Sequence, residues 1–453
     1  MMKLVQAIRK EIKHSFDNLR NEKLKYSLLQ AIPFWIGSVI TGTIAVIYAQ
    51  LFVWGEKVMN LIFDWNGWMI FIIAPIGFVL SWWLIQKFAP YAKGSGIPQV
   101  MAAVELANPK ENSKIKHLLS LKILIIKILS SLALILGGGA IGREGPTIQI
   151  AGSVFRKVNE YLPDWWPKIS KKNMILTGAA AGLSAAFNTP LGGIVFAVEE
   201  LAKTHINYFK TALFTAVIIA GLTAQTLAGS YLYLGYPKTA DVQLTIMFPV
   251  ILVSAIAGIM GSRLSLIMLK ITHWKKRLKN DKEQIIFLVA SALIIASLAF
   301  FVNREILGSG KAIMERTLFT DNKHEDWYMP LFRMIGPALS FTSGGAGGIF
   351  APALSAGASL GSVISGWIQL TPNETNVMIL AGMVAFLTGI TRAPFTSAII
   401  VLEMTDRHSL IFHLMLAGMV SSLISMLISK HSLYDQLKIN YLKELRSTDS
   451  PTS

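Results

Sequence analysis

Long apolar runs are the feature that most limits what this 453-residue chain can fold into. Each run is close to the ~20 residues that an α-helix needs to cross the hydrocarbon core of a bilayer. The runs lie at Ala31–Trp54, Trp68–Lys87, Leu118–Leu136, Phe209–Leu234, Thr245–Leu269, Ile285–Val302 and Leu410–Ile428. Hydrophobic residues make up 53% of the chain and charged residues only 15%, a balance that suits lipid. We therefore expect an all-α, multi-pass membrane protein.

Two further apolar segments, Thr177–Glu200 and Gly348–Glu403, are interrupted by Gly and Pro. Irregular backbone can lie at membrane depth only where protein or a water-filled cavity satisfies its polar groups. We expect the functional site at these interruptions.

The net charge of +16 is concentrated beside the spans. Basic residues precede the first span and follow the last one: Lys3, Arg9, Lys10, Lys13, Arg20, Lys23, Lys25, Lys438, Lys443 and Arg446. Because positively charged loops stay on the cytoplasmic side, both termini are expected there. No nucleic-acid motif accompanies the charge, so membrane orientation explains it better than a nucleic-acid partner. The chain has no cysteine, which excludes disulfides, thiolate metal sites and cysteine nucleophiles.

The interrupted segments repeat one another. Gly142-x-x-x-Pro146, Gly178, Pro190 and Glu199 in the first half correspond to Gly348-x-x-x-Pro352, Gly382, Pro394 and Glu403 in the second. Two related halves are the natural interpretation, as in many secondary transporters, although chance matches of Gly and Pro remain the alternative. We expect halves at about 31–235 and 245–436 of a membrane domain 31–436, after an amphipathic segment 1–30 and before a tail 437–453. The spacing leaves open whether the halves are parallel or inverted.

Three motifs pair Gly with a Pro suited to the first turn of a helix. They are Gly94-Ser95-Gly96-Ile97-Pro98, Gly142-Arg143-Glu144-Gly145-Pro146 and Gly348-Ile349-Phe350-Ala351-Pro352. Each predicts a helix start, whose free N–H groups and partial positive charge favour an anion. Ser95 could add a hydroxyl donor, and Phe350 could narrow the path. Three helix caps packed between neighbours are the alternative, which leaves Glu144 unexplained.

Glu144 is a carboxylate placed among helix ends that attract anions. Ionised, it could occupy the position that the substrate anion takes; protonated, it would lose its charge and swing aside. A second acidic pair, Glu199-Glu200, ends an apolar segment and could receive a proton from the cytoplasm. A solvated helix end beside Lys203 is the alternative interpretation of that pair.

In this order, the three motifs resemble the signatures of the ClC chloride channel and transporter family. The likeness continues through Thr177-Gly178-Ala179-Ala180-Ala181-Gly182 and Phe187-Asn188 to Leu402-Glu403-Met404-Thr405. The resemblance implies a ClC-type fold with two inverted repeats of tilted and broken helices. It also implies a homodimer in the lipid bilayer in which each subunit has its own anion pathway.

The resemblance assigns roles residue by residue. It places chloride at Ser95, Gly96, Glu144, Gly145, Ile349, Phe350 and Tyr434. In it, Glu144 matches the external gating glutamate, and Tyr434 matches the tyrosine that completes the central site and bounds the inner gate. Without the resemblance Tyr434 would be interpreted as an interfacial aromatic.

Some members of this family are passive channels and others exchange chloride for protons. Glu200 falls at the position of the exchangers' internal proton-transfer glutamate, so an H+/Cl− exchange transporter is expected, with a passive, voltage- or pH-gated chloride channel as the alternative. Lys127 matches a lysine buried in the family, but Gln99 and Met101 replace acids often found after the first motif, whereas Glu105 is retained. The inner proton route and the partner of Lys127 are therefore open.

Other chemistries fit less well. Gly357-Ala358-Ser359-Leu360-Gly361 has the spacing of a nucleophile elbow but lies in an apolar Ala/Gly segment without the strand that the elbow needs. His205, His273 and His413 lack metal-ligand spacing. We expect a transporter rather than an enzyme, with chloride and H+ as transported ions and no cofactor or metal. Because the sequence ends at Ser453, soon after the last span, a bacterial inner-membrane location is expected.

Overall fold

The structure is a computed structural model that describes residues 21–202, 210–229, 232–239 and 244–447, with a few residues between 11 and 17. The described chain is helical throughout, and its only β pairings are isolated bridges between loops. The helices are α2 (Glu22–Trp65), α3 (Ile70–Phe88), α4 (Ile97–Glu105), α5 (Ile115–Leu118), α6 (Leu121–Leu136), α7 (Glu144–Glu160), α8 (Lys171–Phe187), α9 (Pro190–Phe196), α10 (Lys210–Ala228), α11 (Met247–Lys275), α12 (Asp281–Phe301), α13 (Lys311–Phe319), α14 (Met329–Thr342), α15 (Phe350–Trp367), α16 (Pro372–Thr391), α17 (Pro394–Thr405), α18 (Ile411–Ile428) and α19 (Leu433–Ser447). The expected all-α fold is confirmed.

Eight helical segments in the described residues are long and apolar enough to cross a membrane. They account for every predicted apolar run and add α16, which the sequence placed inside an interrupted segment. Nearly all of α16 is buried inside the protein, because it packs against α11, α15 and α18. Its neighbours, rather than lipid, therefore surround this helix.

One predicted run is longer than the helix it forms. Helix α10 ends at Ala228, and Gly229 follows with a φ of +87°, a left-handed conformation that terminates a helix. Leu234 lies beyond it in a bend and donates its N–H to the carbonyl of Met404 at 3.1 Å. At the end of the expected span, Tyr233 and Leu234 are therefore buried outside any helix, while Ser230, Tyr231 and Phe209 lie outside the described residues.

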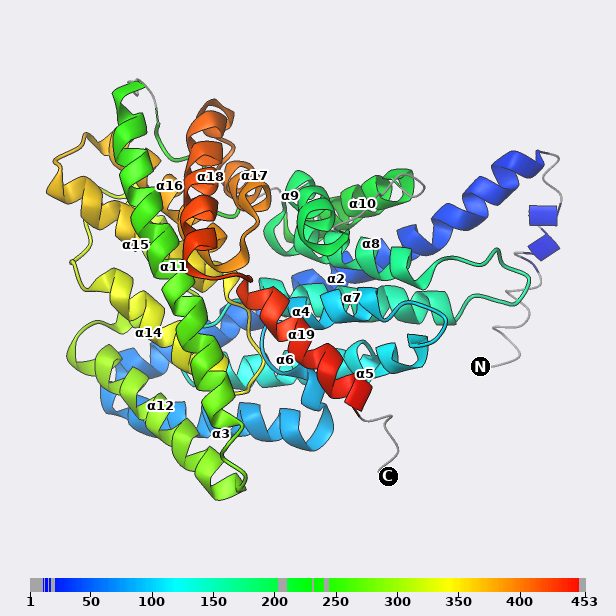
Figure 1. Cartoon of the computed structure of the whole chain (residues 1–453), viewed down its shortest axis with the longest axis horizontal. Helices are drawn as coiled ribbons and strands as arrows, with labels where there is room; N and C mark the ends of the chain where they lie inside the picture. The colour runs from blue at the N-terminus through cyan, green and yellow to red at the C-terminus, as the bar shows by residue number, and fades with distance from the viewer. Residues whose placement is uncertain are drawn as a thin grey trace.

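The internal repeat is visible at matching breaks in the two halves. Asn188 ends α8 with a φ of 57°, and Arg392 ends α16 with a φ of 62°. Each stands two residues before the proline that begins the next helix, at Pro190 and at Pro394. Helix α7 packs on α8 as α15 packs on α16. In Figure 1, α15 to α18 lie at the upper left, and α8 to α10 lie to the right.

The two halves also cap each other's helices. The Glu199 carboxylate accepts the N–H groups of Phe395 at 3.2 Å and Thr396 at 2.7 Å, in the first turn of α17. Reciprocally, the Glu403 carboxylate accepts N–H groups in the first turn of α9, from Leu191 at 3.0 Å and Gly192 at 2.7 Å. Such an exchange is the relation expected of two halves joined by a pseudo-twofold axis.

The reciprocal caps change the interpretation of the Glu199-Glu200 pair. Glu199 caps a helix of the other half, so its interpretation as part of a solvated helix end is wrong. Glu200 lies on the following π-helical turn, Ala197–Ala202, and is buried. Lys203, the basic neighbour invoked for the solvated end, lies outside the described residues.

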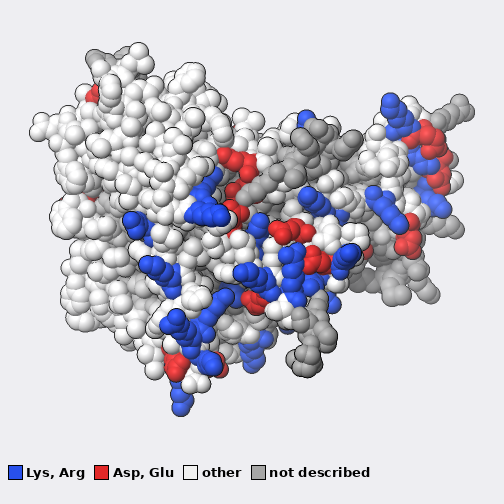
Figure 2. All heavy atoms as spheres, in the orientation of Figure 1, with Lys and Arg blue, Asp and Glu red and all other residues white. Residues whose placement is uncertain are grey.

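Charged side chains cover only part of the surface. In Figure 2, Lys and Arg gather in a band from the lower end of α11 across α19 toward the start of α2, whereas the surface over α15, α16 and α18 is nearly free of charge. This separation fits a protein with a membrane-facing belt and one basic face. Helix α2 begins at Glu22 and α19 continues to Ser447.

Candidate anion-binding site

All three predicted helix starts are confirmed. Helix α4 begins after Gly96, α7 after Arg143 and α15 after Ile349. Gly96 has a φ of 103°, which a residue with a side chain adopts only with strain. The first turn of each helix is buried, so its free N–H groups face protein interior rather than solvent.

Backbone hydrogen bonds hold the three helix starts together. Gly142 and Gly348 exchange two such bonds, at 2.8 and 2.7 Å. Gly94 donates to the carbonyl of Gly345 at 2.8 Å and accepts from Gly347 at 3.1 Å. The loop before α15 therefore pairs with the loops before α7 and before α4, and the positive ends of all three helices meet in one region.

Two buried hydroxyls lie in this region. Ser95 is 1% exposed and Tyr434 is 0% exposed, so the interfacial interpretation of Tyr434 is wrong. Their hydroxyl groups face one another, yet neither makes a well-formed hydrogen bond within the described residues. A buried polar group without a partner costs about 1–3 kcal/mol, and an anion between the two would accept from both.

Gly145 allows this approach. A Cβ atom on Gly145 would overlap the Ser95 hydroxyl and lie 3.0 Å from the Ser95 carbonyl oxygen. Only glycine therefore lets the first turn of α7 lie against Ser95.

Aromatic rings surround the start of α15. The Phe350 ring is buried, with centroids 6.3 Å from Phe187, 6.5 Å from Phe196 and 6.2 Å from Tyr434. Ile349 is buried beside it.

Glu144 lies at the start of α15 although it belongs to α7. Its carboxylate is 1% exposed and lies beside the backbone N–H groups of Ala351 and of Glu144 itself. The Tyr233 hydroxyl donates a long bond of 3.5 Å to Oε1. Nothing in the sequence indicated Tyr233, which follows the end of α10. The carboxylate thus occupies a place where helix N–H groups would bind an anion.

Glu200 lies apart from these helix starts. It is 4% exposed and lines a cavity of about 360 Å³ together with Met101, Glu105, Lys172 and Lys438. Lys438 forms an ion pair with Glu105 at 3.4 Å. The cavity gives water a path toward an otherwise buried carboxylate.

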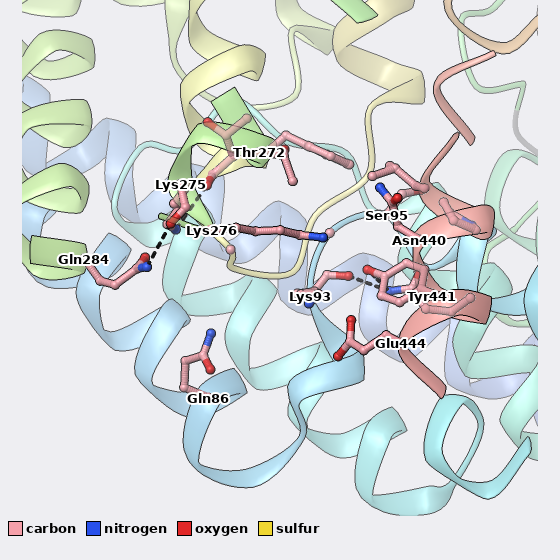
Figure 3. Close-up of a pocket in the computed structure, with 17 residues that line it drawn as sticks. Gln86, Lys93, Ser95, Thr272, Lys275, Lys276, Gln284, Asn440, Tyr441 and Glu444 are labelled. Atoms are coloured by element: carbon pink, nitrogen blue, oxygen red, sulfur yellow. Dashed lines mark hydrogen bonds between the residues drawn. The ribbon is translucent and has the colours of Figure 1, made fainter. Parts of the chain in front are cut away.

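A separate cavity of about 180 Å³ leads to Ser95 (Figure 3). Lys93, Lys275 and Lys276 line it, against one acid, Glu444. This basic lining favours an anion over a cation. We call this cavity the vestibule.

The open question about Lys127 has a structural answer. Lys127 is fully buried, and its Nζ donates to the carbonyls of Ala92 at 2.9 Å and Gly94 at 2.8 Å. Gln99 donates to the carbonyl of Lys93 at 2.6 Å and to the Tyr441 hydroxyl at 3.1 Å. These two side chains therefore brace the turn that carries Ser95.

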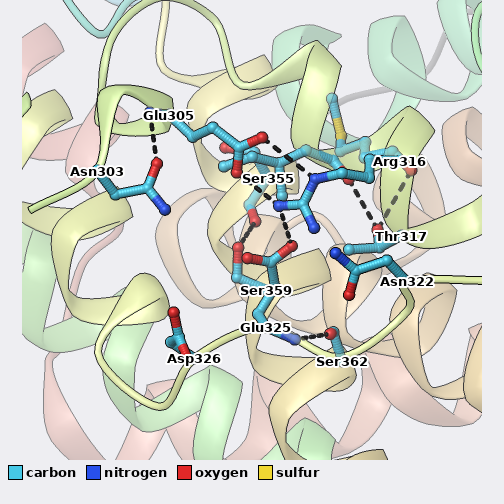
Figure 4. A network of polar contacts seen from close by, with 12 residues as sticks. Asn303, Glu305, Arg316, Thr317, Asn322, Glu325, Asp326, Ser355, Ser359 and Ser362 are labelled. Carbon is cyan, nitrogen blue, oxygen red and sulfur yellow. Dashed lines mark hydrogen bonds and ion pairs between the residues drawn. The ribbon is translucent and has the colours of Figure 1, made fainter.

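Sequence reasoning missed an ion-pair network at the loops around α13 (Figure 4). Arg316 contacts Glu305 at 2.5 Å and Glu325 at 2.6 Å, and the Glu325 N–H donates to Ser362 of α15 at 2.8 Å. Burial raises the pKa of Glu325 to about 7, although the nearby Arg316 charge opposes that rise.

The serine-hydrolase alternative fails on geometry. Ser359 lies in the middle of α15, where its hydroxyl donates to the carbonyl of Ser355 at 2.8 Å. A nucleophile elbow instead needs a sharp strand-to-helix turn. Within the described residues no group of three or more His, Asp or Glu side chains is placed to hold a metal ion; His205 lies outside them.

Fold and site together define a multi-pass, all-α membrane protein with a buried site suited to an anion. The sequence profile of the family described as "Voltage gated chloride channel" matches residues 76–426. The chain therefore belongs to the ClC chloride channel and transporter family.

Named relatives and solved structures agree with this family assignment. Proteins named "H(+)/Cl(-) exchange transporter ClcA" from Salmonella newport and Salmonella agona are each 28% identical over 414 residues, covering 88% of this chain and 85% of theirs. A slow cyanobacterial Cl−/H+ antiporter superposes with a TM-score of 0.78 at 23% identity, covering 92% of this chain and 98% of that one. A CLC-type fluoride/proton antiporter superposes with a TM-score of 0.76 at 19% identity, over 92% of this chain and 98% of that one. These structures support the ClC-type fold.

Proposed function

We propose that this protein is a secondary transporter that exchanges chloride for protons. The observation that carries the proposal is the convergence of three helix amino termini on two buried hydroxyls that face one another, with the Glu144 carboxylate at the start of α15. The exchanger names of the bacterial relatives support it.

Chloride would enter through the vestibule and accept the hydroxyls of Ser95 and Tyr434, with backbone N–H groups of Gly96, Gly145, Ile349 and Phe350 around the path. Ionised Glu144 competes for the N–H groups at the start of α15. Protonation removes its charge and releases those groups to the anion. Dipoles rather than a full cation hold the ion, so it can also leave.

Glu200 would supply the inner end of the proton route. It is buried beside a cavity that Glu105 and Lys438 line, so a proton can reach it from water without crossing the vestibule. Separate routes for proton and anion on the inner side are what an exchanger needs. The passive chloride channel remains the competing function.

We further propose a homodimer in a bacterial inner membrane, with both termini cytoplasmic and the basic band facing the cytoplasm. The division into segments 1–30, 31–436 and 437–453, with halves near 31–235 and 245–436, is part of this proposal. The transported ions are chloride and H+, and no cofactor or metal takes part in it.

Proton movement driven by a chloride gradient in purified proteoliposomes tests the function. The wild type should move protons uphill, whereas Glu144→Gln and Glu200→Gln should carry chloride without protons. Glu283→Gln, at an exposed acid in the first turn of α12, is the matched control and should behave as wild type. If the wild type carries chloride but moves no protons against a gradient, the channel function replaces the exchanger.

A further inference from the structure

A second basic cavity lies at the end of α11. It has a volume of about 480 Å³, within the range of ligand sites, and α19 closes its other side. Lys270, His273, Lys276 and Arg277 line it, together with Leu266 and Leu269. No carboxylate lines it.

The positive charge of this cavity is not neutralised by the protein. Lys270, Lys276 and Arg277 are exposed and form no ion pair within the part of the chain that the structure describes. In contrast, Lys438 and Arg446 on the neighbouring α19 are paired with Glu105 and Glu111. Lys276 also repels Lys93, which lies near it. An anionic ligand would relieve this repulsion.

The length of α11 favours a position of the cavity at the depth of lipid headgroups. Helix α11 has 29 residues, and at 1.5 Å per residue it is about 44 Å long, whereas the hydrocarbon core is about 30 Å thick. Its basic end therefore projects into the interface. Trp274, 47% exposed, is an aromatic of the kind that anchors helices there. Leu266 and Leu269 precede Trp274 by about one and a half to two helical turns, on the side toward the membrane.

We propose that this cavity binds the headgroup of an anionic phospholipid. The phosphodiester would contact Lys270, Lys276 and Arg277, and the first carbons of the acyl chains would lie along Leu266 and Leu269. A free phosphate has the same negative charge as the headgroup but no acyl chains. The apolar lining of Leu266 and Leu269 therefore favours the lipid. Basic pockets at the cytoplasmic ends of membrane helices bind such headgroups elsewhere.

The cavity adjoins the anion pathway. Thr272, Lys276 and Asn440 line both this cavity and the vestibule that leads to Ser95 (Figure 3). A bound phosphodiester would offset the charge of Lys276 at the mouth of the vestibule. Lipid binding should therefore raise the chloride concentration needed for half-maximal flux from that side.

Direct binding tests the site without reference to transport. We would measure phosphatidylglycerol retained by the purified protein by native mass spectrometry, with phosphatidylcholine and inorganic phosphate as the other probes. The double variant Lys270→Gln/Arg277→Gln should bind phosphatidylglycerol about 25-fold more weakly, since each basic residue at an anionic surface contributes about fivefold. Lys279→Gln/Lys282→Gln removes the same charge from exposed positions outside the cavity and should bind as wild type.

Three outcomes would overturn the proposal. Equal losses in the two double variants would mean that surface charge, not the cavity, holds the lipid. Equal retention of phosphatidylcholine would remove the role of the anionic charge. Full displacement by inorganic phosphate would make the cavity a site for the free ion. Lipid binding that persists in a protein without proton exchange would leave this proposal standing and refute only the proposed function.

Discussion

Replacing Gly145 by alanine should displace the Ser95 hydroxyl from the anion site. The added Cβ would overlap the Ser95 hydroxyl and lie 3.0 Å from the Ser95 carbonyl oxygen. Rotating the hydroxyl away relieves only the first contact, so the turn before α4 must also shift. Ser95 would then no longer present its hydroxyl beside that of Tyr434.

The cost can be estimated from the hydrogen bond that is lost. A hydrogen bond to a charged partner contributes about 1.5–3 kcal/mol, which corresponds to about 12- to 150-fold in affinity. We therefore expect Gly145→Ala to weaken chloride binding by about one to two orders of magnitude.

Gly152 supplies the matched control in the same helix. A Cβ on Gly152 would meet its nearest atom, Leu119 Cδ2, at 3.4 Å, an ordinary contact. Helix propensity favours alanine by up to about 1 kcal/mol at Gly152, inside the helix, and this gain applies less to Gly145 in the first turn, so the comparison rests on chloride affinity rather than on stability. Isothermal titration with chloride in detergent measures the difference. Equal chloride affinities for Gly145→Ala, Gly152→Ala and the wild type would refute the placement of Ser95 in the site.

Three further predictions concern the helix caps, the ion-pair network around α13 and the proposed gate at Tyr434. Glu403→Gln should lower the melting temperature, because the first turn of α9 loses a charged acceptor that contributes about 1.5–3 kcal/mol per bond, while Glu283→Gln should not. Burial raises the pKa of Glu325 from its ordinary 4.5 to about 7, so the folded protein binds more protons than the unfolded chain between these values. Stability should therefore fall as pH rises through that window. Melting curves of Glu325→Gln from pH 5 to 8 should lose this component, and an unchanged slope would contradict the burial argument. Tyr434→Ala should reduce chloride binding and let chloride pass without its proton, whereas Tyr434→Phe, which keeps the ring, should be milder; equal proton-to-chloride ratios in both variants and in the wild type would contradict a gating role.

The sequence predicted the elements of the site better than their contacts. Gly and Pro at fixed spacing identified the starts of α4, α7 and α15, because local backbone requirements decide where such helices begin. The equal intervals to Glu199 and Glu403 also indicated the repeat. They did not indicate that each acid caps a helix of the opposite half, since that depends on how the halves pack.

Other features depend on tertiary burial and left no local signal. By its position in the sequence alone, Tyr434 would be interpreted as an interfacial aromatic, yet it is fully buried against Phe350. Tyr233 reaches Glu144 from a loop whose sequence looked like the end of a span. Arg316 and its two glutamates are distant enough in sequence that only the folded loops bring them together.

The central claim is that the Glu144 carboxylate and chloride compete for the same N–H groups. Crystals of the wild type and of Glu144→Gln grown in bromide, with the anomalous signal of bromide recorded, test it most directly. The wild type should show bromide between the hydroxyls of Ser95 and Tyr434. Glu144→Gln should add a second peak at the first turn of α15, beside the N–H of Ala351. An unchanged set of peaks in Glu144→Gln, or bromide bound away from these helix starts, would contradict the account.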